Sequence, residues 1–273
     1  QRLGTRRWWK CMRPLHSHKV SASLAHPLCC RQLHSAGISE LNDAWSRPSV
    51  QELPALPGVV AAKLDRLVSA FPLAYQRQPS KSAINERRGH FTSYASSRSG
   101  GEFDPVNVVQ LLCSAGIGPH NSFVDVGSGL GKLVLAAAVA TDVGAAWGIE
   151  LSPWRAAEAE RAMRRLVAMG ALSRVERAKV ELLQGDCGET LPVGVLCASH
   201  WLLALKTLPA GKQVEALLAR LRKVPLQEAR TLWSVGRRLP RAAGLSLGRT
   251  LVLTVVSERS WRTDIAVHEY RLS

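Results

Sequence analysis

The stretch that decides the fold reads Phe123-Val124-Asp125-Val126-Gly127-Ser128-Gly129-Leu130-Gly131. A short apolar run ends here at three glycines, and the apolar residues that follow have helical spacing. This pattern predicts a buried strand, a tight turn and the start of a helix. Glycine suits such a turn because the backbone bends sharply and can approach a ligand without a Cβ in the way. We therefore expect a ligand to lie over the turn.

The spacing of these glycines narrows the kind of ligand. A dinucleotide-binding turn has the pattern G-x-G-x-x-G, whereas the third glycine comes one residue earlier here, and no G-K-[ST] phosphate loop follows. The acid before the glycines, Asp125, suits a ligand with an amino group, such as the methionine part of S-adenosylmethionine. The expected cofactor contacts in this stretch are Asp125, Gly127, Ser128, Gly129 and Gly131.

Two further carboxylates end the next two expected strands. Glu150 comes 19 residues after Gly131, where a carboxylate can accept hydrogen bonds from both ribose hydroxyls of a nucleoside. Asp186 ends the strand after that, where it can accept a hydrogen bond from the amino group of adenine. Either residue alone could be a helix cap or a solvated charge. Three carboxylates at three successive strand ends favour a nucleoside site.

The surrounding sequence alternates strands and helices. The expected strands are 122–126, 145–150, 180–184, 193–198 and 250–256, and the expected helices are 59–71, one starting at 104–105, 132–141, 152–170 and 211–223. This order predicts an α/β fold with a Rossmann-like, doubly wound, mainly parallel sheet. Residues 264–272 follow too closely for a helical crossover, so they should pair antiparallel at the edge. Residues 224–247 show no clear period and stay unassigned.

Length and charge set the domain organisation. The 273 residues suit one domain, 55–273, with a helical lead-in at 55–120 and a cofactor-binding sheet at 121–273. Residues 1–39 contain seven Lys or Arg and no acid, so 1–54 is interpreted as a disordered leader, a targeting arm or a nucleic-acid-binding arm. The net charge of +15 favours a polyanionic partner, although a generally basic surface would have the same composition.

Several motifs resemble those of one family. They are F-V-D-V-G-S-G-L-G-K at 123–132, W-G-I-E at 147–150, G-E-F at 101–103, G-D-C at 185–187 and C-A-S-H-W at 197–201. Residues 100–273 look like a class I S-adenosylmethionine-dependent methyltransferase, and the motifs resemble the disruptor-of-telomeric-silencing family, the non-SET histone lysine methyltransferases. The resemblance implies a seven-stranded methyltransferase sheet, Glu102 in a loop over the methionine end, and Asp186 with Cys187 at the adenine. Where this family usually has asparagines, the chain has Ser199 and His200.

The expected acceptor side of the site follows the strand at 193–198. There Ser199, His200 and Trp201 are candidate catalytic residues that line an acceptor channel, with the alternative that Trp201 is core and His200 a surface residue. By the resemblance the acceptor is a lysine, with a histone or nucleosome as substrate and the nucleus as compartment. The rivals are methyl transfer to RNA or another protein, in a mitochondrion or plastid if the leader is a targeting segment, and an inactive cofactor-binding chromatin module.

Other site types and a membrane location are not supported by the sequence. The six cysteines have no C-x-x-C spacing and no pattern of a zinc site, so no metal is expected. No apolar run is long enough to cross a bilayer, so no membrane partner is expected. Contact with DNA or RNA through the basic surface is plausible on charge alone, and the oligomeric state is left open.

Overall fold

The computed structural model describes residues 53–75, 102–189, 191–204, 212–224, 229–239, 244–256 and 262–273. All of these residues belong to one compact unit that runs from Arg47 to Ser273. Residues 76–101 of the expected lead-in lie outside the described residues, and so does nearly all of the expected leader. Among the described helices, none combines the length and the apolar character that a membrane crossing requires.

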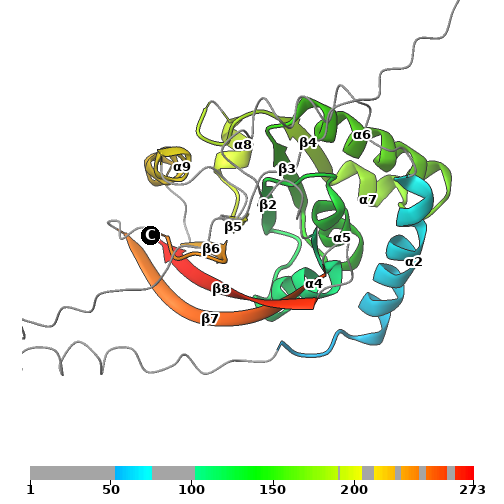
Figure 1. Ribbon diagram of the computed structural model, residues 1–273, viewed down its shortest axis with the longest axis horizontal. Coiled ribbons are helices and arrows are strands. Elements are labelled where there is room, and N and C mark those ends of the chain that lie inside the picture. Colours follow the sequence, from blue (N-terminus) through cyan, green and yellow to red (C-terminus); the bar gives the residue numbers. More distant parts are fainter. Residues whose placement is uncertain are drawn as a thin grey trace, which may run out of the picture. The chain divides into compact units, whose positions relative to one another are not determined.

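An eight-stranded mixed sheet forms the centre of this unit (Figure 1). Its strands are β1 (Glu102–Phe103), β2 (Ser122–Val126), β3 (Ala145–Glu150), β4 (Val180–Gln184), β5 (His200–Leu203), β6 (Arg230–Val235), β7 (Leu245–Val256) and β8 (Arg262–Leu272). Their order is β1-β7-β8-β6-β5-β2-β3-β4. Strands β6, β5, β2, β3 and β4 are parallel, and β8, β7 and β1 continue the sheet with antiparallel pairs. The predicted Rossmann-like methyltransferase sheet with an antiparallel end is confirmed.

Helices cover both faces of the sheet (Figure 1). They are α2 (Gly58–Ala74), α4 (Pro105–Ser114), α5 (Lys132–Ala140), α6 (Pro153–Ala168), α7 (Arg174–Ala178), α8 (Val193–Leu196) and α9 (Lys212–Lys223). Successive residues of β2 point to opposite faces, so Phe123 packs in the core under α2, α4, α5 and α6, and Val124 packs in the core under α8 and α9. Two separate apolar cores therefore enclose the central strands, as doubly wound folds require.

The prediction of a strand at 193–198 is wrong. This segment is the short helix α8, and the strand that lies between β2 and β6 is β5, His200–Leu203. Both segments are short apolar runs, and periodicity cannot distinguish a buried strand from a buried helical turn. Pro192 precedes the helix with φ −55° and ψ 143°, and such a residue starts a helical turn more readily than it continues a buried strand.

The unassigned stretch 224–247 contains a central strand, β6, in which every residue is buried. Sequence patterning missed it because three of its buried residues are polar: Arg230, Thr231 and Ser234. Two of them have partners far along the chain: Arg230 donates to the carbonyl of Leu196 at 2.9 Å, and Thr231 accepts from Arg271 at 2.6 Å. Partners at such sequence distance leave no local pattern.

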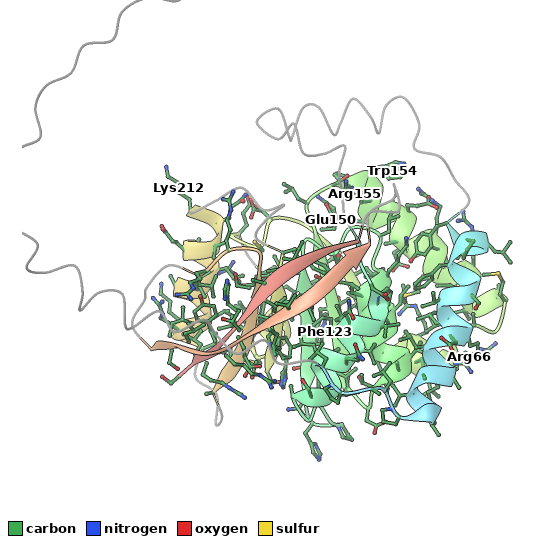
Figure 2. The ribbon with its side chains drawn as sticks, turned by 60° about the horizontal axis from the view of Figure 1, so that its bottom comes forward. Arg66, Phe123, Glu150, Trp154, Arg155 and Lys212 are labelled. Carbon is green, nitrogen blue, oxygen red and sulfur yellow. The ribbon has the colours of Figure 1, made fainter. Side chains whose placement is uncertain are left out.

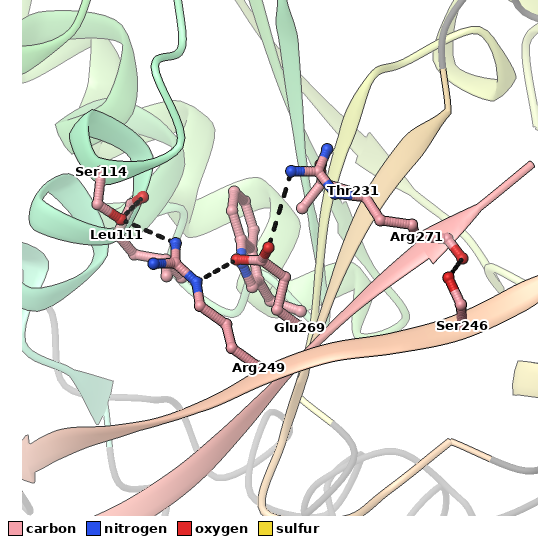
Figure 3. Close-up of polar contacts among 8 residues, drawn as sticks. Leu111, Ser114, Thr231, Ser246, Arg249, Glu269 and Arg271 are labelled. Carbon is pink, nitrogen blue, oxygen red and sulfur yellow. Dashed lines mark hydrogen bonds and ion pairs between the residues drawn. The ribbon is translucent and has the colours of Figure 1, made fainter. Parts of the chain in front are cut away.

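Strand β8 pairs antiparallel, as predicted, but lies inside the sheet between β6 and β7. Its buried carboxylate, Glu269, accepts from Trp233 Nε1 at 3.1 Å and from Arg249 Nε at 3.0 Å, and lies 3.8 Å from Arg271 (Figure 3). Arg249 also donates to Ser114 of α4 at 3.4 Å. This network connects the β7–β8 hairpin to β6 and to α4.

Candidate functional site

The glycine turn joins β2 to α5 at the carboxyl edge of the parallel strands. Gly127, Gly129 and Gly131 have φ of 83°, 57° and 77°, a region that other residues adopt only with strain. The amides of Gly127 and Ser128 donate to the carbonyl of Ile149 at 2.8 and 3.1 Å. A Cβ at Gly129 would meet nothing within 4 Å, so this part of the turn faces open space. The turn can therefore accept a ligand against its backbone, as the sequence predicts.

Glu150 at the end of β3 is held by the turn itself. Its two carboxylate oxygens accept from the amide of Gly129 at 2.7 Å and from the amide of Ser152, at the start of α6, at 2.8 Å. Figure 2 labels Glu150 together with Trp154 and Arg155 of the first turn of α6. Each oxygen keeps a further lone pair, so the carboxylate can still accept ribose hydroxyls. The geometry fits the role expected of Glu150.

Asp125 is the most perturbed carboxylate at this edge. It is 2% exposed, and burial, followed by the charge of Glu150, raises its pKa to about 7. A cationic amino group beside Asp125 would favour the ionised carboxylate and offset both effects. The pair of buried carboxylates therefore provides the negative potential that an aminoacyl, sulfonium-bearing cofactor needs.

The glycine of W-G-I-E is Gly148, and the sequence alone indicated no role for it. A Cβ on this residue of β3 would lie 2.7 Å from the Ser128 hydroxyl and 2.9 Å from a Leu182 methyl group. Such contacts are far shorter than ordinary van der Waals distances, so Ser128 and the turn would have to shift. The absent side chain thus lets the glycine turn lie directly on β3.

The lead-in helix α2 contacts the glycine turn, and nothing in the sequence pattern predicted this. Tyr75, the residue that ends α2, donates from its hydroxyl to the carbonyl of Leu130 at 2.9 Å. The ammonium of Lys132 lies 5.1 Å from the Tyr75 ring centre and 5.9 Å from that of Phe71, within the range of cation–π attraction. Arg165 of α6 donates to the carbonyl of Ala74. The end of α2 is therefore fixed against the turn.

Asp186 follows β4 at the same edge of the sheet. Its carboxylate accepts from the amide of Gly188 at 2.8 Å and from the side chain of Gln213, on α9, at 2.5 Å. Cys187 is 4% exposed, and burial, with the charge of Asp186, raises the pKa of its thiol to about 12. A neutral, buried thiol offers apolar contact to an adenine ring, and Gly185 connects to β3 through a 3.0 Å bond to the Glu150 carbonyl. Asp186 and Cys187 thus lie where the prediction needs them.

Glu102 begins β1, where its backbone pairs with Val256. Because β7 runs parallel to β6 and β2, Val256 is at the carboxyl edge that also carries the glycine turn. Strands β7, β8, β6 and β5 separate β1 from β2. Glu102 was expected in a loop and lies instead in this short strand at the carboxyl edge, and its role over the methionine end stays a prediction.

Ser199, His200 and Trp201 were expected to be catalytic because they would follow a strand. That expectation of their position is wrong, since Ser199 precedes β5 and His200 and Trp201 begin it. His200 pairs with Phe123, near the start of β2, and so lies toward the amino edge. The hydroxyl of Ser199 donates to the carbonyl of Ser122 at 3.1 Å and lies 2.8 Å from His200 Nδ1. Trp201 is fully buried and donates to the carbonyl of Ala198.

The environment of His200 is that of a core residue. Its ring stacks on Trp233 at 5.4 Å, and burial, with the charge of Arg271, lowers its pKa to about 4. The residues that occupy the carboxyl end of β5 are Leu203 and Ala204, neither of which has a polar side chain. Among the described residues, the carboxyl end of β5 is therefore apolar.

The comparison with known families decides the class of the protein. The family described as "Histone methylation protein DOT1" matches residues 81–197, which include the glycine turn, Glu150 and Asp186. The fold, the geometry of the site and this match all indicate the same class of enzyme. The chain is a methyltransferase of the S-adenosylmethionine-dependent class, and it resembles DOT1. The match ends before β5, so strands β5 to β8 of this methyltransferase lie outside it.

Solved structures with similarity to this methyltransferase include several from microbes. TrmN from Thermus thermophilus is 18% identical, with 62% of this chain and 49% of that chain covered and a TM-score of 0.44. An RNA methyltransferase from Salinibacter ruber in complex with S-adenosyl-L-homocysteine is 23% identical, with 60% and 89% covered and a TM-score of 0.38. Thermoplasma acidophilum 1320 is 14% identical, with 79% and 98% covered and a TM-score of 0.47. No similar protein was found among curated sequences.

The residues at the edge fit S-adenosylmethionine. Asp125 would face the methionine amino group, Glu150 the ribose and Asp186 the adenine, with the backbone of Gly129 against the ligand. Bound there, the cofactor supplies an electrophilic methyl group. Among the described residues, no cluster of three His, Cys, Asp or Glu side chains has the geometry to hold a metal ion.

Proposed function

We propose that this methyltransferase transfers a methyl group from S-adenosylmethionine to a lysine side chain of a histone, most directly in a nucleosome. The observation that carries the proposal is the match to the histone methylation family across 81–197. That segment includes the glycine turn and the three carboxylates expected to contact the cofactor, Asp125, Glu150 and Asp186. The compartment that follows from this proposal is the nucleus.

Methyl transfer is an in-line displacement, so the protein must align the acceptor with the methyl group and exclude water. A lysine amine holds its proton up to a pH of about 10.4 in water, and burial in apolar surroundings lowers that pKa. The carboxyl end of β5, Leu203-Ala204, is apolar and adjoins β2. An acceptor lysine that enters beside this strand end would lose its proton more readily than in water.

A second candidate is methyl transfer to RNA or to another protein. It is favoured by the end of the family match at residue 197, which leaves β5 to β8 outside it. The net charge of +15 also suits an RNA acceptor as well as a nucleosome. The third candidate function is an inactive, cofactor-binding chromatin module. It is favoured by the absence of a polar side chain at the carboxyl end of β5, Leu203-Ala204.

Transfer of tritiated methyl from S-adenosylmethionine to reconstituted nucleosomes, free histones and total RNA, assayed in parallel, separates these functions. Gly129→Arg is the matched control, because its side chain would fill the open space over the turn. Label on nucleosomal histone lysine that the control abolishes supports the proposal. Label on RNA alone would overturn it in favour of the second candidate, and cofactor binding without any label would favour the inactive module.

The compartment has its own test. A fluorescent fusion of the complete gene should locate to the nucleus if the substrate is a nucleosome. A mitochondrial or plastid signal would instead support the targeting interpretation of residues 1–54 and a non-histone acceptor.

A further inference from the structure

The last turn of α2 is weak by its own sequence. Pro72 lies in this turn and has no amide hydrogen, so the bond that position 72 would donate to the carbonyl of Val68 is missing. The last turn also contains no Lys or Arg that could bond the final carbonyls of the helix. The end of α2, with the adjoining Tyr75 that contacts the glycine turn, therefore depends on groups from other elements.

Arg165 of α6 supplies a cation at this helix end. Helices α2 and α6 pack against each other (Figure 1), and Arg165 Nη1 donates to the carbonyl of Ala74, the last residue of α2. A cation is favourable there because the free carbonyls form the negative end of the helix dipole. The next residue is Tyr75, whose hydroxyl donates to the carbonyl of Leu130 at 2.9 Å. Arg165 thus holds the residue directly before the one that contacts the turn.

Glu158, also on α6, fixes the direction of the Arg165 guanidinium. Glu158 is 2% exposed, and a buried carboxylate is stable only when it is paired. Its Oε1 accepts from Arg165 Nη1 at 3.1 Å, and its Oε2 accepts from Arg161 Nε at 2.8 Å. The same nitrogen of Arg165 therefore contacts both Glu158 and α2. Within the described part of the chain, Arg161 forms no hydrogen bond or ion pair with α2.

We propose that Arg165 is a positioning residue for cofactor binding that acts through Tyr75. Because it holds the Ala74 carbonyl, it keeps the Tyr75 hydroxyl within hydrogen-bond distance of Leu130. The glycine turn then stays in the conformation that binds S-adenosylmethionine. The inference rests on the cofactor and not on the identity of the methyl acceptor. It goes beyond the proposed function, since it assigns part of the cofactor affinity to a residue that no cofactor-binding motif includes.

The competing explanation is that the two arginines only stabilise the burial of Glu158 in the core. In that case, loss of either arginine would lower the stability of the protein by a similar amount and leave cofactor affinity unchanged. A positioning role instead predicts that only Arg165 changes the affinity. It also predicts that the effect of Arg165 disappears when Tyr75 lacks its hydroxyl.

The experiment measures binding of S-adenosylhomocysteine by calorimetry in the wild-type chain, Arg165→Met, Arg165→Lys and Arg161→Met. Arg161→Met is the matched control, because it removes the same charge from the same helix and from the same carboxylate. The side chains of Arg161 and Arg165 are also similarly exposed, at 32% and 35%. Arg165→Lys keeps a cationic donor for Ala74. Tyr75→Phe and the double variant Tyr75→Phe/Arg165→Met complete a double-mutant cycle, and thermal melting shows that each variant is folded.

Arg165→Met should weaken binding about threefold to tenfold, the range of one hydrogen bond, and Arg165→Lys should recover most of this loss. Arg161→Met should bind within about twofold of wild type, and Arg165→Met should add less than about twofold in the Tyr75→Phe background. Equal effects of Arg165→Met and Arg161→Met, or additive effects in the cycle, would overturn the proposal and leave the cofactor assignment intact. Wild-type protein that binds no S-adenosylhomocysteine would overturn both.

Discussion

The hydroxyl of Tyr75 donates a 2.9 Å hydrogen bond to the carbonyl of Leu130, so the residue that caps the carboxyl end of the lead-in helix fixes the glycine turn. The turn has three residues with positive φ, and it lies between β2 and α5 in the chain and against β3 in space. A side chain from 55 residues upstream therefore stabilises the conformation that binds the cofactor. The lead-in helix is part of the site and not merely a cover for the sheet.

Tyr75→Phe should weaken S-adenosylhomocysteine binding about threefold to tenfold, because one hydrogen bond of about 1 kcal/mol to the turn is lost while the ring stays over Lys132. Calorimetry measures the affinity, and steady-state kinetics should show the change in KM with kcat nearly constant. Leu73→Ala is the control, since Leu73 is 57% exposed on the same helix. Equal affinity in Tyr75→Phe and wild type would remove Tyr75 from the site.

Cofactor binding should depend on the ionisation of Asp125. Its pKa is about 7 in the free protein, so the carboxylate is mostly protonated at pH 6 and mostly ionised at pH 8. Because the ionised form attracts the amino group, S-adenosylhomocysteine should bind about tenfold more tightly at pH 8 than at pH 6. Titration calorimetry across this range measures the effect, and a flat profile in the wild-type chain would contradict it.

Asp125→Asn should stabilise the cofactor-free protein while it abolishes tight binding. A carboxyl group whose pKa is raised from 3.8 to about 7 on folding binds more protons in the native state between those values, so stability falls as pH rises through that window. The neutral amide avoids this loss, which is up to ~4 kcal/mol at pH 8. Urea denaturation of both proteins at pH 5 and pH 8 tests the sign. A variant less stable than wild type at pH 8 would refute it.

Gly148→Ala should lower both stability and cofactor affinity. Its Cβ would lie 2.7 Å from the hydroxyl of Ser128 and 3.0 Å from the Cβ of Ser128, so the glycine turn must move away from β3. A cost of about 1–3 kcal/mol is typical of such overpacking. Gly194→Ala is the control, because a Cβ at Gly194 meets nothing within 4 Å. Adding Ser128→Gly should restore part of the loss, and no effect of Gly148→Ala on melting or binding would show that the turn does not rest on β3.

His200 should affect stability and its pH dependence, and not catalysis. Its pKa falls from 6.5 to about 4 on folding, so between these values the unfolded chain binds more protons and stability falls as pH falls. The difference between wild type and His200→Phe should change by about 2 kcal/mol between pH 7.5 and pH 5, in the direction that weakens wild type in acid. Denaturation at both pH values measures it. Cofactor affinity should stay within about twofold of wild type, and a large loss of binding would return His200 to the site.

The sequence predicted the cofactor side of the molecule well, because that side is built from local patterns. An apolar run, a set of glycines and an acid at each strand end lie close together in the chain and need no distant partner to be recognised. The strands β2, β3 and β4 and the helix α5 follow these patterns closely. Asp125, Glu150 and Asp186 therefore lie at one edge, as expected.

Strands β5 and β6 and helix α8 could not be predicted in the same way. Strand β5 and helix α8 are both short apolar runs, and only the pairing of β5 with β2 and β6 distinguishes them. Strand β6 has buried polar residues whose partners, such as Arg271, come from far along the chain. The contacts of Tyr75 and Gln213 likewise join segments far apart in sequence. Long-range pairing of this kind leaves no periodic signal in a single sequence.

The central claim is that the turn from Gly127 to Gly131 binds S-adenosylmethionine, and calorimetric titration of the full chain with S-adenosylhomocysteine tests it most directly. Wild type should bind one equivalent, and Gly129→Arg should bind none while it melts cooperatively, because the open space at this glycine is filled. Asp125→Asn gives a second route to the same loss without added bulk. Equal binding by wild type and both folded variants, or no binding by wild type, would contradict the claim.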